Sequence, residues 1–247
     1  MKDDKVSTKV CQKTWQLITH IGATIICYLI FKNNDFFRNS NNTIFHPLKL
    51  PQPPSDIIYL YIYLIAIWVY STVKHVFFEH RRADYYVLLM HHAITISLMV
   101  GSYEYHFTKI GMFILFIHES SDIIVESLKI SNYLKLNGKK SYYLSETLLV
   151  TNIITWFIIR NYMFIKFLYD MYYTVGTNEV TFGSNFFARI YNIPGFLVLS
   201  LLLDSLEVLH IYWIILFIKL AYTVVKSGIA DASELYEQDG KKTKKNN

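Results

Sequence analysis

The stretch "VLLMHHAITISLMVGSY", residues 87–103, decides the fold: it is almost wholly apolar or small, yet it contains two adjacent histidines. It lies within one of six apolar windows in a chain of 247 residues that is 53% hydrophobic and 17% aromatic. Each window approaches or exceeds the roughly 20 residues with which a helix crosses a bilayer. The windows are residues 15–31, 57–78, 85–103, 107–128, 144–169 and 193–225.

These windows predict an all-α polytopic membrane protein with six transmembrane helices. A spanning backbone must satisfy its own hydrogen bonds, and the chain lacks the alternating ten-residue pattern of a membrane barrel. The first window is the least apolar, because it contains Thr19, His20 and Thr24. For that window, a position on the membrane surface is the alternative. We expect a cytosolic segment over residues 1–14, one membrane domain over 15–226 and a basic cytosolic tail over 227–247.

The distribution of Lys and Arg predicts the orientation of the helices. With six spans, about 16 of these residues fall on the side of the termini and about five on the other side. The positive-inside rule therefore places both termini in the cytosol, and the net charge of +5 requires no nucleic-acid partner. The first apolar window lacks the pattern of a cleaved signal peptide, so we expect none.

Three smaller features of the sequence lead to separate predictions. The sequon at Asn41 lies in a loop that this orientation places on the luminal side, where it is a candidate for glycosylation. Lys244 and Lys245 resemble the dilysine signal that returns membrane proteins to the endoplasmic reticulum, although a solvated charge run is the alternative. Cys11 and Cys27 form neither a disulfide framework nor a thiol metal site, and we expect both to be packing residues.

Polar residues recur at matched depth in separate helices. His91 and Asp122 each lie roughly 10 Å from the cytosolic surface. His118, Asp122 and Glu126 follow i, i+4, i+8 spacing and predict a polar stripe on one helix face, flanked by Glu119. The last window adds Asp204, Glu207 and His210 at successive i+3 steps.

Charges at this depth are costly, roughly 2.5 to 3.5 kcal/mol each, so they predict a shared polar cavity enclosed by the helices. The alternative is structural, with the same side chains acting as hydrogen bonds between helices. Neighbouring helical residues point about 100° apart, so His91 and His92 should have different surroundings and roles. A carboxylate beside an imidazole fixes its tautomer and strengthens it as a base or nucleophile.

Three stretches together resemble the TLC domain, and specifically the Lag1 motif of ceramide synthases. They are "RRADYYVLLMHHAITISLMVGSY", "IGMFILFIHESSDIIVESLKISNYL" and "LLLDSLEVLHIYWIILFIKLAY". The resemblance extends from about Trp15 to Tyr222. It implies an enzyme of the endoplasmic reticulum membrane that transfers an acyl group from acyl-CoA to the amine of a sphingoid base. It implies no metal or other cofactor. The implied partners are fatty acyl-CoA, a sphingoid base and membrane lipids, with a homo- or heterodimer as a further option.

The resemblance also implies site residues. The implied catalytic residues are His91, His92, His118, Glu119 and Asp122, with either histidine of the pair as nucleophile or base and Asp122 orienting it. The implied substrate-binding residues are Arg81, Arg82, Glu126, Arg160, His210 and Trp213, the first two within a basic collar suited to CoA phosphates.

Two departures and two rival readings accompany the resemblance. Glu119 replaces the aspartate that most ceramide synthases have, and the chain begins at what would be the family's second helix. A histidine-box di-iron enzyme is disfavoured by too few suitably placed histidines. A TLC protein without catalysis, acting in translocation, cargo transport or lipid homeostasis, is the stronger rival.

Overall fold

The computed structural model describes residues 2–33, 55–78, 84–177 and 185–227, and within them the chain forms helices and no strand. The all-α prediction is therefore confirmed. The first four helices are α1 (Lys2–Asn33), α2 (Ser55–Phe78), α3 (Tyr85–Glu104) and α4 (Thr108–Tyr133). A short 3₁₀ turn, η1 (Lys139–Ser141), precedes α5 (Leu144–Thr155), the π-helix η2 (Trp156–Met163) and α6 (Phe164–Thr177). The chain continues as α8 (Phe186–Asn192) and α9 (Phe196–Ser227).

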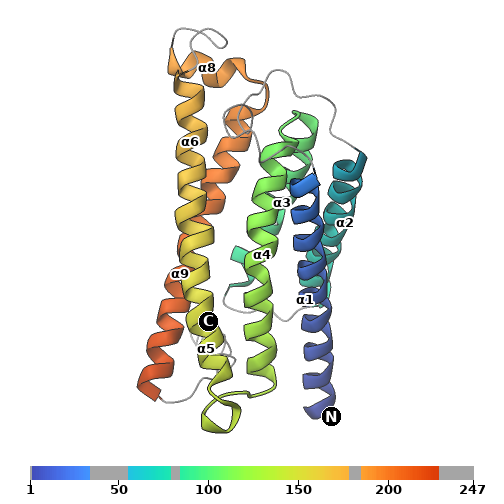
Figure 1. The fold of residues 1–247 in the computed structure, drawn as a ribbon, viewed down its shortest axis with the longest axis vertical. Helices are drawn as coiled ribbons and strands as arrows, with labels where there is room; N and C mark the ends of the chain where they lie inside the picture. Colours follow the sequence, from blue (N-terminus) through green and yellow to red (C-terminus); the bar gives the residue numbers. More distant parts are fainter. Residues whose placement is uncertain (1, 34–54, 79–83, 178–184, 228–247) are drawn as a thin grey trace, which may run out of the picture.

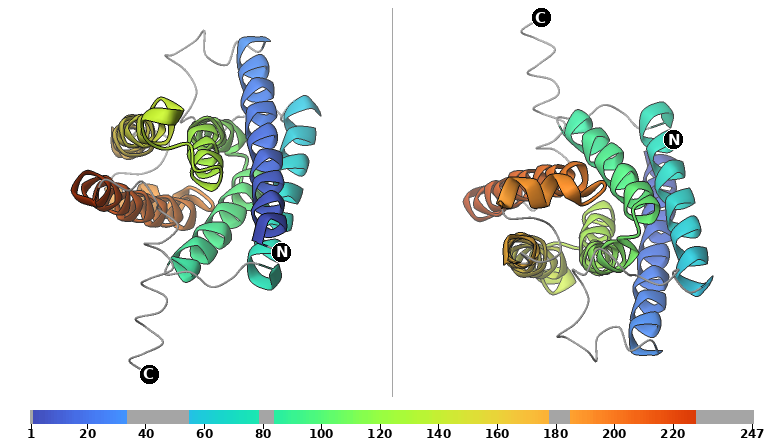
Figure 2. Two further views of the ribbon diagram at one scale, coloured as in Figure 1. Left: turned by 90° about the horizontal axis from the view of Figure 1, so that it is seen from below. Right: turned by 90° about the horizontal axis from the view of Figure 1, so that it is seen from above.

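The long helices run alternately up and down, and α1 begins at the same end of the bundle at which α9 finishes (Figure 1). α4 lies near the centre and packs against α1, α3, α5 and η2. α3 in turn packs against α2 and α9 (Figure 2). This arrangement brings α3, α4, η2 and α9 together, the four elements that carry most of the predicted site residues.

Five helices in the described residues are long and apolar enough to cross a membrane: Val6–Asn33, Ser55–Phe77, Tyr85–Glu104, Leu144–Thr177 and Phe196–Lys226. α4, with 26 residues, is long enough to be the sixth span, but it carries several charged residues. Those in its middle face the bundle, since the Glu119 side chain is only 2% exposed and the Asp122 side chain 18%. We therefore treat α4 as a spanning helix whose polar groups are shielded from lipid by its neighbours.

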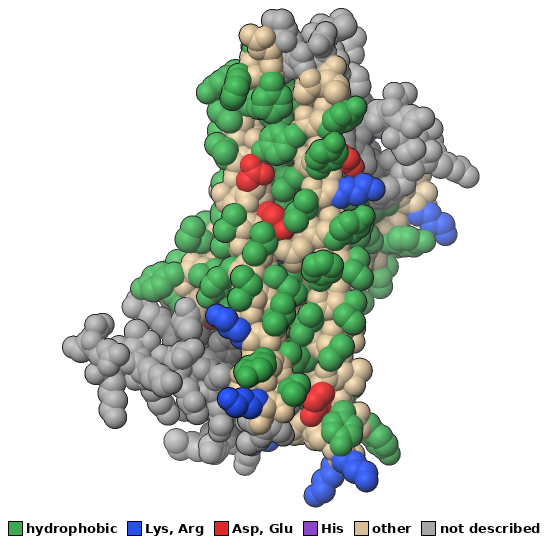
Figure 3. All heavy atoms as spheres, turned by 90° about the vertical axis from the view of Figure 1, so that its left-hand side faces the viewer, with side chains coloured by type: hydrophobic (Ala, Val, Ile, Leu, Met, Phe, Trp, Pro, Cys, Tyr) green, Lys and Arg blue, Asp and Glu red, His purple; other side chains and the backbone are tan. Residues whose placement is uncertain are grey.

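The outer surface of the bundle is apolar, as a bilayer requires. Figure 3 shows hydrophobic side chains covering the face formed largely by α6 and α9, with a few Lys and Arg side chains in its upper part and others toward its lower end. Val198, Leu201, Val208 and Ile218 of α9 are all exposed on the surface. In water so large an apolar face would be unfavourable, whereas against lipid tails it is not.

α1 belongs to the bundle and does not lie on the membrane surface. Its Ala23, Cys27 and Phe31 are buried in a core cluster that also contains residues of α2, α3 and α4. α1 is already helical at Lys2, so most of the predicted segment 1–14 continues the first span as helix. The Asn41 sequon and the Lys244–Lys245 pair lie outside the described residues.

A tight turn between α3 and α4 sets the depth of the site. Phe107 N donates to Ser102 O at 2.7 Å, and His106 adopts a left-handed conformation with φ 61°. His91 lies about four helical turns before this corner and His118 about three turns after it. The two histidines consequently reach similar depths on adjacent antiparallel helices, as their spacing in the sequence predicts.

Candidate functional site

Two histidines from different helices form the centre of a buried polar cluster. His118 of α4 and His210 of α9 are joined through their Nε2 atoms at 3.0 Å, and His210 is completely buried. His118 Nδ1 lies 2.7 Å from the carbonyl oxygen of Ile114. Because a carbonyl can only accept, Nδ1 of His118 carries a proton and donates it. Glu207 of α9 lies 3.2 Å from Nδ1 of His210 and therefore fixes the orientation of that ring.

Arg160 connects this centre to Asp122. The guanidinium group donates to Asp122 Oδ1 at 2.5 Å, to Ser121 Oγ at 2.6 Å and to the carbonyl oxygen of His118 at 3.0 Å. It also lies over the ring of Trp156, 4.6 Å from the ring centroid. Arg160 is 1% exposed, so its charge is neutralised within the protein by Asp122. Asp122 thus contacts an arginine, and the expectation that it orients a histidine of the pair is wrong.

A local departure from α-helical geometry accompanies Arg160. The eight residues of η2 form a π-helix between α5 and α6, and π-helical turns occur frequently at functional sites. The same element positions Asn161, whose Nδ2 donates to Glu207 Oε1 at 3.1 Å. Sequence periodicity does not predict this geometry, so Asn161 was missed as a member of the cluster.

His91 of α3 faces the cluster. Its ring centroid lies 6.5 Å from that of His118, 5.1 Å from that of Trp213 and 5.5 Å from that of Trp68. His91 is 5% exposed, and its Nδ1 atom is buried without a hydrogen-bond partner. A buried polar atom without a partner is costly in a folded protein and often marks the place of a ligand or reactant.

His92 faces a different group of residues on α2. Its Nδ1 lies 3.0 Å from Thr72 Oγ1, and its ring stacks on that of His75 at 5.7 Å. Thr72 donates its one hydroxyl proton to the carbonyl oxygen of Trp68 at 2.8 Å, so it accepts from Nδ1–H of His92. The predicted difference in surroundings between His91 and His92 is confirmed.

Glu119 and Glu126 point away from the histidine cluster and toward α1. Glu119 Oε2 lies 2.6 Å from His20 Nδ1, and Glu126 Oε2 lies 3.3 Å from Lys13 Nζ. Glu126 also accepts from Lys129 at 2.6 Å. The prediction that Glu126 shares one polar face with His118 and Asp122, flanked by Glu119, is therefore wrong.

A period of seven residues explains this second set of contacts. Lys13 and His20 are seven apart on α1, and Glu119 and Glu126 are seven apart on the antiparallel α4. Seven residues make nearly two helical turns, so both pairs meet along one interface. This matched spacing was the sequence signal that could have identified His20 and Lys13 as partners.

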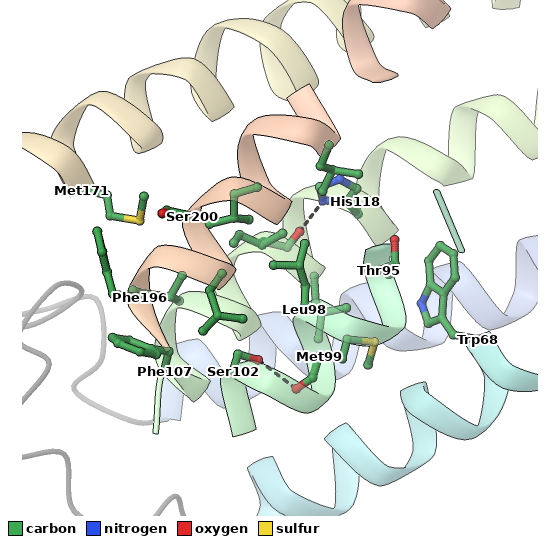
Figure 4. A pocket seen from close by; sticks show the side chains of 17 residues that line it. Trp68, Thr95, Leu98, Met99, Ser102, Phe107, His118, Met171, Phe196 and Ser200 are labelled. Atoms are coloured by element: carbon green, nitrogen blue, oxygen red, sulfur yellow. Dashed lines mark hydrogen bonds between the residues drawn. The ribbon is translucent and has the colours of Figure 1, made fainter. Parts of the chain in front are cut away.

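An apolar pocket begins beside the cluster and continues between α3, α4 and α9. His118, Thr95 and Trp68 lie at one side of it in Figure 4, and Phe107, Phe196 and Met171 at the other. Between them the walls are mostly aliphatic. The buried polar cluster thus lies at one end of the pocket, and the adjoining cavity is suited to a hydrocarbon chain. The lining also includes Leu98, Met99, Ser102, Ile110, Gly111, Ile114, Leu115, Leu199, Ser200, Leu203 and Leu206.

The other predicted site residues divide into two groups. Trp213 and His210 lie in the cluster, since Trp213 contacts both His91 and Trp156. Arg81 and Arg82 lie outside the described residues. Among the residues that the structure describes, no group of three or more His, Cys, Asp or Glu side chains is arranged to hold a metal ion.

The fold and the site together define a multi-pass helical membrane protein with a buried cluster of histidine, arginine and carboxylate groups next to an apolar pocket. The TLC domain family model matches residues 9–219, so the chain belongs to this family.

Several curated relatives also match this chain over most of its length. ASC1-like protein 1 of Oryza sativa subsp. japonica is 27% identical over 228 residues, covering 89% of this chain and 70% of the relative. Ceramide synthase 1 of Homo sapiens is 24% identical over 240 residues, covering 94% and 65%. Sphingosine N-acyltransferase lag1 of Schizosaccharomyces pombe is 27% identical over 232 residues, covering 91% and 56%. The chain therefore spans between roughly half and three quarters of the length of these relatives.

Proposed function

We propose that this chain is a ceramide synthase, an acyltransferase that joins the fatty acyl group of acyl-CoA to the amine of a sphingoid base. Membership of the TLC family and the names of the curated relatives support this reading. The observation that carries it is the position of His91. This buried imidazole, with an unpartnered Nδ1, lies near both His118 and Trp68, two residues that line the apolar pocket.

His91 is the histidine of the pair that we assign to the chemistry. Its Nδ1 can attack the thioester carbonyl, forming an acyl-imidazole and releasing CoA as thiolate. The amine then attacks the acyl-imidazole, forms the amide and returns the imidazole. Alternatively, His91 takes the proton of an amine that attacks the thioester directly. CoA release before addition of the sphingoid base distinguishes the first route from the second.

The remaining cluster residues position this group. Arg160 and Asp122 form a neutral pair that holds α4 against η2, and the His118–His210 contact ties α4 to α9. A reacting carbonyl must be held in fixed geometry against its nucleophile, since misplacement by about 1 Å can cost 10²-fold in rate. His92, held by Thr72 on α2, positions α3 on the opposite side.

The apolar pocket is our candidate site for the acyl chain. It extends from His118 toward Phe107, away from the end of the bundle at which α1 begins and α9 finishes. With the thioester beside His91, CoA would lie toward that end, where Lys135, Lys139 and Lys140 are exposed. Together with Arg81 and Arg82, these lysines form the basic collar that we propose for the CoA phosphates.

We place the chain in the endoplasmic reticulum membrane with both termini in the cytosol. The asymmetry of Lys and Arg supports this orientation, as does the meeting of the first and last spans at one end of the bundle. CoA esters on the cytosolic side would then reach His91 from the basic end. A protease-protection assay on tags at each terminus in sealed microsomes tests the orientation.

The test of the function uses the purified full chain in lipid nanodiscs with labelled sphinganine and acyl-CoA esters of increasing length. We expect ceramide with at least one ester and loss of product in His91→Asn. The matched control is His106→Asn, at an exposed histidine in the α3–α4 turn where Asn tolerates the left-handed conformation. A wild-type chain that is inert with every ester would refute the synthase proposal and favour a TLC protein without catalysis.

A further inference from the structure

A threonine on the same face of α3 as His91 has a hydroxyl without a partner. Thr95 follows His91 by four residues, so the two side chains are neighbours, with Cβ atoms about 5–6 Å apart. Thr95 is 8% exposed, and its Oγ1 atom is buried and makes no hydrogen bond. Thr95 also lines the apolar pocket, near His118 and Trp68 (Figure 4).

This behaviour differs from that of most other threonines in the helices. A helical threonine ordinarily donates its hydroxyl to the carbonyl oxygen four residues earlier. Within the described residues, Thr19, Thr72, Thr151, Thr155, Thr174, Thr177 and Thr223 all do so, at 2.8–3.0 Å. Thr95 does not donate to the carbonyl of His91. Thr24 of α1 is also unpartnered, but it does not line the pocket.

The pocket's two serine hydroxyls give a second comparison. Ser102 donates to the carbonyl oxygen of Met99 and Ser200 to that of Leu197, each at 3.0 Å. Both are therefore satisfied without a ligand. Thr95 is the lining hydroxyl whose donor capacity is unused, and it lies at the end of the pocket where the histidines gather.

We propose that Thr95 is a catalytic residue that donates its hydroxyl hydrogen to the acyl carbonyl oxygen of the bound thioester. This inference rests on the proposed function. When a nitrogen lone pair attacks the carbonyl carbon, the C=O π electrons move to oxygen, and Thr95 stabilises that oxyanion while keeping its own proton. Collapse re-forms C=O and breaks the C–S bond, so the electron pair leaves with the CoA thiolate.

Thr95 would stabilise the oxyanion whether His91 acts as the nucleophile or as the base. If His91 is the nucleophile, the oxyanion precedes the acyl-imidazole; if His91 is the base, the amine nitrogen makes the attack. In either case one proton lost by the amine can neutralise the thiolate. A donor that meets the developing charge in a site without water contributes more than it would in solution.

Thr95→Val is the informative variant, because it keeps the shape of the side chain and removes the hydroxyl. We expect a fall in kcat of about 10²-fold or more with little change in KM for either substrate. We expect the unfolding temperature to remain unchanged or to rise, since a buried hydroxyl without a partner is removed. Thr95→Ser should recover much of kcat. Thr174→Val, which removes a hydroxyl bound to its own helix, is the matched control and should behave as wild type.

Three outcomes would overturn the role of Thr95: wild-type kcat in Thr95→Val, an equal loss in Thr174→Val, or a loss of kcat that follows a lower unfolding temperature. Failure of the proposed function is separate, because the wild-type chain would then make no ceramide. In that case the role of Thr95 is tested by measuring the binding of substrate analogues. Wild type should bind a ketone analogue with CH₂ in place of sulfur more tightly than the corresponding alkyl-CoA thioether, which lacks the carbonyl. If Thr95→Val retains the same preference, the carbonyl contact is refuted.

Discussion

Arg160 and Asp122 form the buried ion pair that joins η2 to α4, with Nη2 and Oδ1 2.5 Å apart. The guanidinium uses two further hydrogen bonds, to Ser121 Oγ and to the carbonyl oxygen of His118. The planar fork of arginine suits several acceptors at once, whereas a lysine ammonium is a compact charge on a flexible stem. The pair therefore fixes the orientation of the helix that carries His118 as well as balancing charge.

Arg160→Ala should destabilise the protein strongly, because it leaves Asp122 without its counter-charge in a partly buried position. Removal of one partner from such a pair costs about 3–5 kcal/mol. Arg160→Lys keeps the charge but loses hydrogen bonds, and we expect a smaller loss of about 1.5–3 kcal/mol. Thermal unfolding in one detergent measures both variants. If Arg160→Lys has the wild-type unfolding temperature, the fork geometry has no structural importance.

Glu119 and Asp122 are two carboxylates of α4 whose substitution should affect acyltransferase activity differently. Glu119→Gln should retain most acyltransferase activity, because its carboxylate faces His20 on α1 and not the histidine cluster. Asp122→Asn should lose most activity, because Arg160 would be left with a buried charge beside His118. Initial rates with sphinganine and the best acyl-CoA, measured on both variants in nanodiscs, check the difference.

The reverse order of activities would contradict the separation of the two faces of α4. Thermal unfolding supplies the control. Glu119→Gln should lower the unfolding temperature to about the same extent as His20→Ala, and the double variant should lose little more. Additive losses would show that His20 and Glu119 do not interact in the membrane.

Much of this site was predictable from the geometry of the α-helix, and the predictions that were wrong have identifiable physical causes. The 100° rotation between successive residues predicted different surroundings for His91 and His92, and depth along antiparallel helices predicted the approach of His91 to α4. The same rotation explains why the prediction for Glu119 was wrong. His118 and Glu119 are adjacent in the helix, so they must face different neighbours. His20 suggested a weak span, although it is the partner that makes Glu119 tolerable in the bundle.

Two features could not be predicted from helical periodicity. The position of Arg160 depends on a π-helix, in which side chains leave the 3.6-residue pattern used to assign faces. Thr95 has an ordinary helical threonine sequence context. Thr95 is distinguished by a hydroxyl that makes no hydrogen bond. Recognising such a hydroxyl requires the coordinates of every possible acceptor around it.

Gly195 should be sensitive to substitution for a local steric reason. It has φ +74°, a conformation that side chains rarely adopt, and an added Cβ would collide with the ring of Tyr105. Gly195→Ala should therefore lower the unfolding temperature, whereas Gly22→Ala on α1, where a Cβ would meet nothing within 4 Å, should raise it or leave it unchanged. Equal unfolding temperatures for the two variants would contradict this account of the α8–α9 turn.

The length of the pocket predicts which acyl chains fit. Along α4, the distance from His118 to Phe107 is about 16 Å at a rise of about 1.5 Å per residue. An extended chain advances about 1.25 Å per carbon, given C–C bonds near 1.52 Å and angles near 111°. The pocket therefore matches the length of about 13 carbons beyond the reacting end, and longer chains must displace Phe107, which precedes α4, or Phe196, which begins α9.

Substitutions at this end should shift the product profile in opposite directions. Phe107→Leu opens space and should increase the relative rate with longer acyl-CoA esters, while Ile110→Phe fills space and should favour shorter ones. Leu is preferred to Ala at position 107, because Phe→Ala in a core costs about 3–5 kcal/mol and risks unfolding. Competition assays with an equimolar acyl-CoA mixture, read by mass spectrometry of the ceramides, measure the shift. An unchanged profile in both variants would mean that the acyl chain lies elsewhere, since a chain in this pocket must contact both side chains.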